Sequence, residues 1–333
     1  MAFGKLGQTF SALEIYQIVK DDLKSVEEEI RLESIASIDT ISAITKHLHA
    51  GGGKRLRPTL LLLACRLFGK PGETAFRLGA VVEMVHTATL VHDDVIDVAE
   101  TRRGRASTNM LWGNHTSVLA GDWLYMQAFQ MALKERNFRV LDLLISLTQL
   151  MVEGEVLQLE RIGKLSVSEA DYMDLVDRKT ASLFSVCARL GAIVGGANEE
   201  EESRLGNFAW NLGMAFQLVD DILDFTASES VLGKPVGNDL REGKITLPLI
   251  YALENATPIE KQAVEAVLRS SDYAEISFER IFEFTSSQKG IERARKRAEV
   301  FADAARKIIS SFPDSNVQRA LAAISELVTE RDH

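Results

Sequence analysis

Six aspartates stand in two similar clusters, each of which interrupts an otherwise apolar stretch of the sequence. The clusters consist of Asp93, Asp94 and Asp97, and of Asp220, Asp221 and Asp224. In a helix, the first and last aspartates of a cluster lie one turn apart and face the same way, with the middle one about 100° further round. Carboxylates this close together repel one another and resist burial unless cations balance them. We therefore interpret both clusters as cation ligands.

The repetition of the cluster is stronger evidence for a cation site than either copy alone. A single acidic patch on a helix is most often a solvated surface. Two copies within apolar helical patterns are hard to explain in that way. Oxygen ligands without nearby histidine or cysteine ligands favour Mg²⁺, with Mn²⁺ as an alternative, and Mg²⁺ commonly shares its coordination with substrate phosphates. The pattern predicts a metal-bridged diphosphate between the two clusters.

Basic loops that contain glycine accompany the aspartates. Residues 51–58 read Gly-Gly-Gly-Lys-Arg-Leu-Arg-Pro, residues 102–104 follow the first cluster as Arg-Arg-Gly, and residues 232–244 follow the second cluster. By itself, the first loop reads as an exposed basic turn. Beside two aspartate clusters, the three loops supply the cations that a diphosphate needs. We interpret residues 232–244 as a mobile loop that closes over the phosphates.

The combination closely resembles the trans-isoprenyl diphosphate synthases, the polyprenyl synthetase family, over more than half of the chain. The resemblance rests on both aspartate clusters together with the basic loops, Gly121-Asp122, Lys179-Thr180 and Gln217. It implies an all-α isoprenoid synthase fold, in which antiparallel helices surround a central cavity with the aspartates at its mouth. It also implies a homodimer and an Mg²⁺-dependent prenyltransferase.

The same resemblance assigns roles to individual residues. The family positions that bind the head group of isopentenyl diphosphate correspond to Lys54, Arg57, His86 and Arg103, with Arg55 as a further candidate. The positions that hold the diphosphate of the allylic substrate correspond to Arg102, Lys179, Lys234 and Lys244. Thr180 and Gln217 correspond to positions beside the reacting carbons, so we group them with Lys179 and the aspartates as candidate catalytic residues.

The implied reaction breaks an allylic C–O bond, which leaves negative charge on the diphosphate and positive charge on carbon. Metal ions and basic side chains stabilise the leaving diphosphate. The double bond of isopentenyl diphosphate then attacks the cation, and a proton leaves to the released diphosphate. The site must exclude water, because water would capture the cation.

Small residues before the first aspartate cluster bear on product length. Ala88 and Thr89 precede Asp93 by one turn, about 6–7.5 Å deeper along the helix, and Val85 and Met84 lie on the next turn. Short-chain members of the family typically place an aromatic residue here. The open space predicts an octaprenyl to decaprenyl product of the kind used as a quinone side chain. The alternative is a floor on another helix and a farnesyl or geranylgeranyl product.

Three other functions remain open at this stage. A class I terpene cyclase would share the cavity and the first aspartate cluster, but it does not need a second head-group pocket. A non-catalytic partner subunit of a heteromeric synthase would keep the fold and lose aspartates, and both clusters are complete. A metal-dependent phosphohydrolase built on His92 and Asp93 would need further histidine ligands at helical spacing, which do not occur nearby.

Composition narrows the class of partners. The 333 residues carry a net charge of −10, which disfavours binding to nucleic acid. No apolar run is long enough to span a membrane, so we expect a cytoplasmic protein that contacts a membrane only transiently, to release its apolar product. Cys65 and Cys187 lie in apolar helical patterns without metal-site spacing, and we expect reduced core residues.

The elements that must position these residues are helices, because apolar residues recur at spacings of three and four along most of the chain. Strand-like alternation is nowhere convincing. We predict one helical domain, residues 1–333, with its most apolar helices in the centre. The predicted helices are 11–33, 36–50, 58–69, 74–98, 116–135, 139–161, 168–196, 202–226, 244–254, 258–270, 276–287, 290–311 and 315–331.

Overall fold

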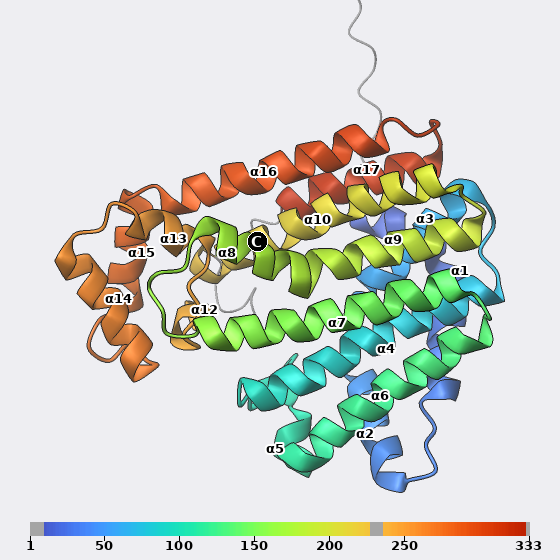
Figure 1. The fold of residues 1–333 in the computed structure, drawn as a ribbon, viewed down its shortest axis with the longest axis horizontal. Helices are drawn as coiled ribbons and strands as arrows, with labels where there is room; N and C mark the ends of the chain where they lie inside the picture. The colour runs from blue at the N-terminus through green and yellow to red at the C-terminus, as the bar shows by residue number, and fades with distance from the viewer. Residues whose placement is uncertain (1–9, 227–235, 331–333) are drawn as a thin grey trace, which may run out of the picture.

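The computed structural model describes residues 10–226 and 236–330, and their architecture is the predicted all-α fold (Figure 1). The longer helices are α1 (Ala12–Glu33), α2 (Asp39–Ala50), α3 (Leu56–Phe68), α4 (Glu73–Ile96), α6 (Asn114–Lys134), α7 (Phe138–Arg161), α9 (Ser182–Gly195), α10 (Glu199–Thr226), α14 (Pro258–Ser270), α15 (Phe278–Ser287), α16 (Gly290–Ile309) and α17 (Asn316–Thr329). Short helices are α5 (Thr108–Trp112), α8 (Glu169–Val176), α12 (Asn238–Arg241) and α13 (Leu247–Leu253).

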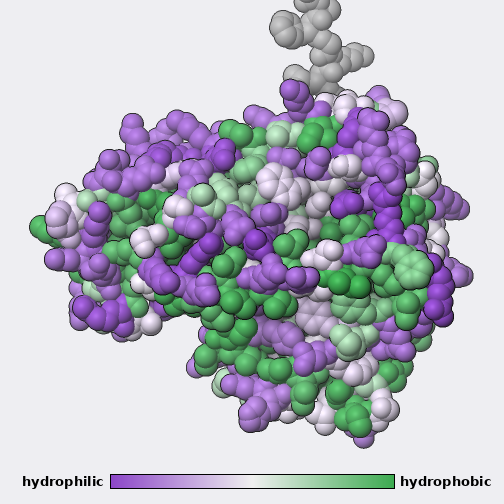
Figure 2. Space-filling model, in the orientation of Figure 1, coloured by the Kyte–Doolittle hydropathy of each residue, from purple (hydrophilic) through white to green (hydrophobic). Residues whose placement is uncertain are grey.

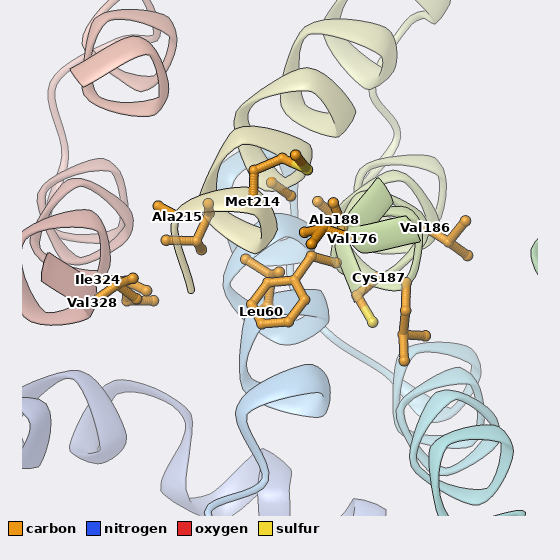
Figure 3. Packing of buried hydrophobic residues seen from close by; sticks show 14 of the residues in the cluster. Leu60, Val176, Val186, Cys187, Ala188, Met214, Ala215, Ile324 and Val328 are labelled. Carbon is orange, nitrogen blue, oxygen red and sulfur yellow. The ribbon is translucent and has the colours of Figure 1, made fainter. Parts of the chain in front are cut away.

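Helices α3, α9 and α10 form the centre of the bundle. Every residue of α3 from Pro58 to Cys65 is buried, as expected for a helix that is apolar on all sides. Leu60, Cys187 and Met214 belong to these three helices and lie in the core that Figure 3 shows. Both cysteines are free and buried, which confirms their prediction as reduced core residues. Helix α16 covers the other side of α10 (Figure 1).

Helix α4, which carries the first aspartate cluster, packs closely against α6. The ring of His92 on α4 lies where a side chain at Gly121 would otherwise stand, since a Cβ at Gly121 would lie 2.2 Å from His92 Nε2. The same nitrogen is 3.1 Å from the carbonyl oxygen of Val118. Gly121 therefore allows the approach of α6 that fixes the end of α4 beside Asp93.

The predicted helices agree with the structure except at a few boundaries. The 168–196 prediction is confirmed as one continuous helical run, which contains a π-helical turn, Asp177–Ala181, between α8 and α9 that the sequence did not predict. The 244–254 prediction starts three residues early, and helices α5 and α12 were not predicted. Two-residue strands, β1 (Thr101–Arg102) and β2 (Arg105–Ala106), form a hairpin after α4. They are too short to show alternation in the sequence.

Among the described residues, none of the helices combines the length and the apolar character that a membrane crossing requires.

Replacement of Gly121 by alanine is expected to destabilise the protein, because the new methyl group would overlap the His92 ring. Overpacking of this kind costs about 1–3 kcal/mol of the free energy of unfolding. Chemical denaturation of Gly121→Ala measures the change. The control is Gln130→Ala, an exposed position on the same helix, where little change is expected. Equal stability of Gly121→Ala and the wild type would show that α6 can retreat from α4 without loss.

Candidate active site

A cavity of about 700 Å³ lies between α4, α7, α8 and α10 and is open to solvent. Its walls include thirteen of the residues predicted from the sequence: Lys54, Arg57, His86, Thr89, Asp93, Arg102, Arg103, Lys179, Thr180, Gln217, Asp220, Asp221 and Lys244. Segments as far apart as residues 54 and 246 therefore meet in one place. The cavity combines two acidic helices with bases from four parts of the chain.

The three aspartates of the first cluster do not share one direction. Asp93 lines the cavity. Asp94 is buried and accepts a hydrogen bond of 2.6 Å from Arg102 Nε, which belongs to the hairpin after α4. Asp97 caps the C-terminus of α4, and both of its carboxylate oxygens are 3.3 Å from Lys244 Nζ. Helix α4 thus ends at the cluster, two residues earlier than the 74–98 range predicted from the sequence.

The second cluster accepts hydrogen bonds from α8, from α12 and from its own helix, α10. Asp220 and Asp221 line the cavity. Asp221 accepts hydrogen bonds from the hydroxyl of Tyr172, at 2.6 Å, and from Nε2 of Gln217, at 2.8 Å. Asp224 accepts a bond of 3.1 Å from the backbone N–H of Asp239. Helix α12 is therefore anchored to the cluster.

Burial opposes the charge of these carboxylates. Burial raises the pKa of Asp93 to about 6, and the nearby Lys179 limits the rise. Burial also raises the pKa values of Asp94 and Asp97, against the opposing charges of Arg102 and Lys244. The site is therefore more favourable to aspartate anions when further positive charge is present.

Burial also raises the pKa of Asp221 in the second cluster. The neighbouring Asp239 adds to the rise, whereas the hydrogen bonds from Tyr172 and Gln217 lower the pKa. Tyr172 and Gln217 therefore favour the ionised form of Asp221.

Lys179 and Thr180 lie in the π-helical turn at the cavity wall. Lys179 Nζ is 2.9 Å from Oε1 of Gln158 and forms an ion pair with Glu155, both on α7. Thr180 donates a hydrogen bond of 2.8 Å to Oε1 of Gln217. Such turns occur often at functional sites, because they place consecutive side chains in directions that an α-helix does not allow.

The remaining bases predicted from the sequence come from residues 51–58, from α4 and from the hairpin. Arg57 Nε is buried and has no hydrogen-bond partner among the residues that the structure describes. Burial lowers the pKa of His86 well below its usual value, and the charges of Arg57 and Arg103 lower it further. His86 is therefore neutral, so it can offer one N–H donor to an anion.

Sequence reasoning missed several residues that hold this site in place. Tyr172, Gln158 and Glu155 each contact a predicted residue directly, as described above. Trp210 also donates a 2.6 Å hydrogen bond to Asp177 at the start of the π-helical turn. No local pattern marks these residues, because their partners lie 21 to 49 positions away in the chain.

A second, largely apolar cavity of about 350 Å³ adjoins the first between α4, α6 and α7. Thr89, Asp93, Met151 and Lys179 line both cavities. Ala88, Val85 and Met84, the other residues predicted to set chain length, are buried and line neither of these two. The helical rotation explains this difference, because only Thr89 lies one full turn before Asp93.

Lys234, the remaining predicted residue, lies outside the described residues. Within residues 10–226 and 236–330, no three histidine, cysteine, aspartate or glutamate side chains gather closely enough to hold a metal ion by themselves.

The sequence matches the polyprenyl synthetase family over residues 38–284, which include both aspartate clusters and every base of the cavity. This chain belongs to that family. It is therefore a prenyltransferase, and members of the family generally depend on Mg²⁺. Its relatives support elongation of trans-prenyl diphosphates in the long-chain range.

Named relatives resemble the chain over nearly its whole length. It is 36% identical over 318 residues to an octaprenyl diphosphate synthase of Escherichia coli (strain K12), covering 96% of this chain and 98% of the relative. A crystal structure of a decaprenyl diphosphate synthase from Rhodobacter capsulatus superposes with a TM-score of 0.91 at 37% identity, covering 97% and 100%. A polyprenyl synthase from Caulobacter crescentus CB15, complexed with calcium and isoprenyl diphosphate, gives a TM-score of 0.92 at 34% identity, covering 98% and 99%.

Proposed function

We propose that the cavity joins isopentenyl diphosphate to an allylic diphosphate in trans geometry and releases a long polyprenyl diphosphate. The observation that carries this proposal is the arrangement of charge in one cavity. Lys54, Arg57 and Arg103 line it together, with Arg103 bonded to the loop that carries Lys54, whereas Lys244 pairs with Asp97 and Lys179 lies near Asp93. Two separate groups of bases suit two diphosphates, one for each substrate. A terpene cyclase or a phosphohydrolase would need only one.

The residues present suit Mg²⁺, with Mn²⁺ as an alternative. The aspartates offer oxygen ligands alone, and burial raises the pKa values of several of them in the absence of a cation. We propose Asp93, Asp94 and Asp97 on α4, and Asp220, Asp221 and Asp224 on α10, as the metal ligands. Because no three of the described carboxylates form a complete site, diphosphate oxygens would complete the coordination.

Bound Mg²⁺ would supply Lewis-acid stabilisation of the leaving diphosphate. Lys179, Lys244 and Arg102 would add positive charge to the same group, and we place Lys234 with them by resemblance. Lys179 must then exchange its contacts with Glu155 and Gln158 for the diphosphate. Likewise, Arg102 and Lys244 must release Asp94 and Asp97, which frees those carboxylates to bind metal.

The second substrate would bind through Lys54, Arg57, His86 and Arg103, where the buried Nε of Arg57 still offers a donor. Thr180 and Gln217 form a hydrogen-bonded pair beside this position and would orient the reacting carbons. The apolar walls, including Leu90 and Phe216, limit the access of water to the cation.

The first experiment incubates the protein with farnesyl diphosphate, labelled isopentenyl diphosphate and Mg²⁺, and then sizes the products by chromatography. We expect label in long polyprenyl diphosphates, none with EDTA, and a loss of rate of roughly 100-fold or more in Asp93→Asn. Asp303→Asn, on the exposed surface of α16, is the matched control. Phosphate release without an allylic substrate would favour a hydrolase. No incorporation with any primer would favour a cyclase or a non-catalytic partner subunit.

We propose that the growing chain passes Thr89 into the apolar cavity between α4, α6 and α7. Thr89 is the predicted chain-length residue that lines both cavities, directly below Asp93. The space beyond it supports an octaprenyl to decaprenyl product, of the kind that serves as a quinone side chain. A shorter farnesyl or geranylgeranyl product is the alternative.

Replacement of Thr89 by phenylalanine is expected to shorten the product by one or more five-carbon units, because the ring would occupy the passage between the cavities. Thr89→Ser is the control, since a serine hydroxyl can keep the 2.7 Å hydrogen bond to the carbonyl of His86. Chromatographic sizing of both products measures the effect. Unchanged length in Thr89→Phe would place the passage elsewhere.

We propose that the chain forms a homodimer through α6 and α7. Leu119, Met126 and Leu133 on α6 repeat every seven residues and are exposed, as are Ile145, Val152 and Leu159 on α7. Two such apolar stripes on neighbouring helices are typical of a protein interface. In the space-filling view, apolar residues gather over the part of the surface where α4, α6 and α7 lie (Figure 2).

Glutamate at both Met126 and Val152 is expected to separate the two copies, because it would bury charge without a partner at the centre of the interface. Sedimentation velocity measures the mass. Val300→Glu, at a similarly exposed apolar position on α16, should leave the dimer intact. A monomeric wild type at micromolar concentration would contradict the proposal.

A further inference from the structure

The loop between α2 and α3 has a left-handed backbone at two positions close to its basic residues. Gly52 and Arg55 both adopt left-handed conformations, with φ of 62° and 49°. This region costs a residue other than glycine about 1–2 kcal/mol. Such a conformation persists only where surrounding contacts determine it. Contacts of Arg55 must therefore hold the loop in this shape.

Two glutamates from different helices hold the Arg55 side chain. Its Nη1 donates a hydrogen bond of 2.8 Å to Oε1 of Glu83 on α4, and its Nη2 donates one of 3.1 Å to Oε2 of Glu27 on α1. Arg55 Nε also donates to Glu27. The side chains of Arg55 and Glu83 are only 14% and 7% exposed, so solvent screens their ion pair little. We call Glu27, Arg55 and Glu83 the Arg55 clamp.

The basic residues of the loop and of the first turn of α3 point to opposite sides. Lys54 and Arg57 line the large cavity that we assign to the substrates. Arg55 instead lines a separate cavity of about 60 Å³, behind the loop, together with Glu83. Arg103 lines both cavities and donates a hydrogen bond to the carbonyl oxygen of Gly52. Arg55 is thus turned away from the proposed diphosphate, although its two neighbouring bases face it.

Glu83 also places negative charge near Arg57 and Arg103, neither of which pairs with a carboxylate among the described residues. Burial lowers the pKa values of Arg57 and Arg103, and the negative charge of Glu83 opposes this effect in both. Glu83 is the first opposing charge that acts on each of them. Removal of its charge would therefore leave three arginines close together with less compensation.

We propose that Arg55 does not bind substrate, and that the Arg55 clamp positions Lys54 and Arg57 for the head group of isopentenyl diphosphate. This inference rests on the proposed function, since it concerns one of the two substrates of that reaction. Arg55, Glu27 and Glu83 are then positioning residues. Their contribution is to the bases of the cavity that we assign to isopentenyl diphosphate.

The rival interpretation, in which Arg55 binds the diphosphate, predicts the opposite change in substrate affinity when Glu27 or Glu83 is replaced. If Arg55 were a ligand, replacing its glutamate partners with glutamine would free a cation for substrate and tighten binding. If Arg55 positions the loop, the same replacements release the loop and weaken binding. Variants of Glu27 and Glu83 therefore separate the two interpretations, whereas variants of Arg55 itself would not.

The experiment measures KM for isopentenyl diphosphate and for the allylic diphosphate in Glu83→Gln and Glu27→Gln. We expect KM for isopentenyl diphosphate to rise about tenfold in Glu83→Gln, the order expected when a buried ionised donor loses its partner. A smaller rise is expected in Glu27→Gln, because Glu27 is 45% exposed. KM for the allylic diphosphate should change less than about twofold. The matched control is Glu28→Gln, next to Glu27 on α1, which loses only an exposed pair with Arg31.

A decrease or no change in KM for isopentenyl diphosphate would overturn the inference, and so would equal rises in both KM values. Hydrogen exchange provides a readout that does not depend on catalysis. The amides of residues 51–57 should exchange faster in Glu83→Gln than in Glu28→Gln, and equal rates would also overturn the inference. If the wild type fails to elongate, the proposed function fails and hydrogen exchange alone decides the clamp. If Glu83→Gln does not fold, the milder Glu27→Gln provides the same comparisons.

Discussion

Repulsion among six carboxylates around one cavity is the constraint on which the rest of this structure depends. Each cluster stands on a helix with a mostly apolar environment, where uncompensated charge is costly. Donors from other elements offset this charge, namely Arg102 for Asp94, Lys244 for Asp97 and Tyr172 for Asp221, and Gln217 on the same helix adds a second donor to Asp221. In the proposed function, metal ions and diphosphate would take the place of Arg102 and Lys244 at Asp94 and Asp97.

The helical frame makes this exchange possible because it stays fixed while side chains change partners. Close approaches of backbone keep the helices in place: Gly121 admits His92 between α6 and α4, and a Cβ at Gly191 on α9 would lie 2.2 Å from the carbonyl of Leu61 on α3. Such contacts leave no room for the helices to slide. The exchange of partners in the proposed function requires movement only of polar side chains such as Lys179 and Lys244. An arrangement of this kind suits catalysis by preorganised charge.

Much of the fold and of the site could be predicted from sequence, where the signal is local. The helical spacing of Asp93 and Asp97, and the glycines beside Lys54 and Arg57, are visible in short windows. The direction of Asp94 was not predictable, because it depends on Arg102 in a hairpin too short to show alternation. Tyr172 and Glu83 were missed for a similar reason: their importance comes from partners on distant elements. Local patterns in the sequence identify the candidate ligands, whereas only the tertiary structure identifies the residues that orient those ligands.

The π-helical turn at Asp177–Ala181 has a consequence for how the sequence can vary in length. A π turn holds one residue more than an α-helical turn, and each residue of a helix accounts for about 100° of rotation. Loss of a single residue between α8 and α9 would restore a regular helix. The helices on either side would keep their relative rotation, but the side chains inside the turn would change direction, so Lys179 and Thr180 would no longer be directed at Gln158 and Gln217. The extra residue therefore sets the directions of Lys179 and Thr180 without altering how α8 and α9 face their neighbours.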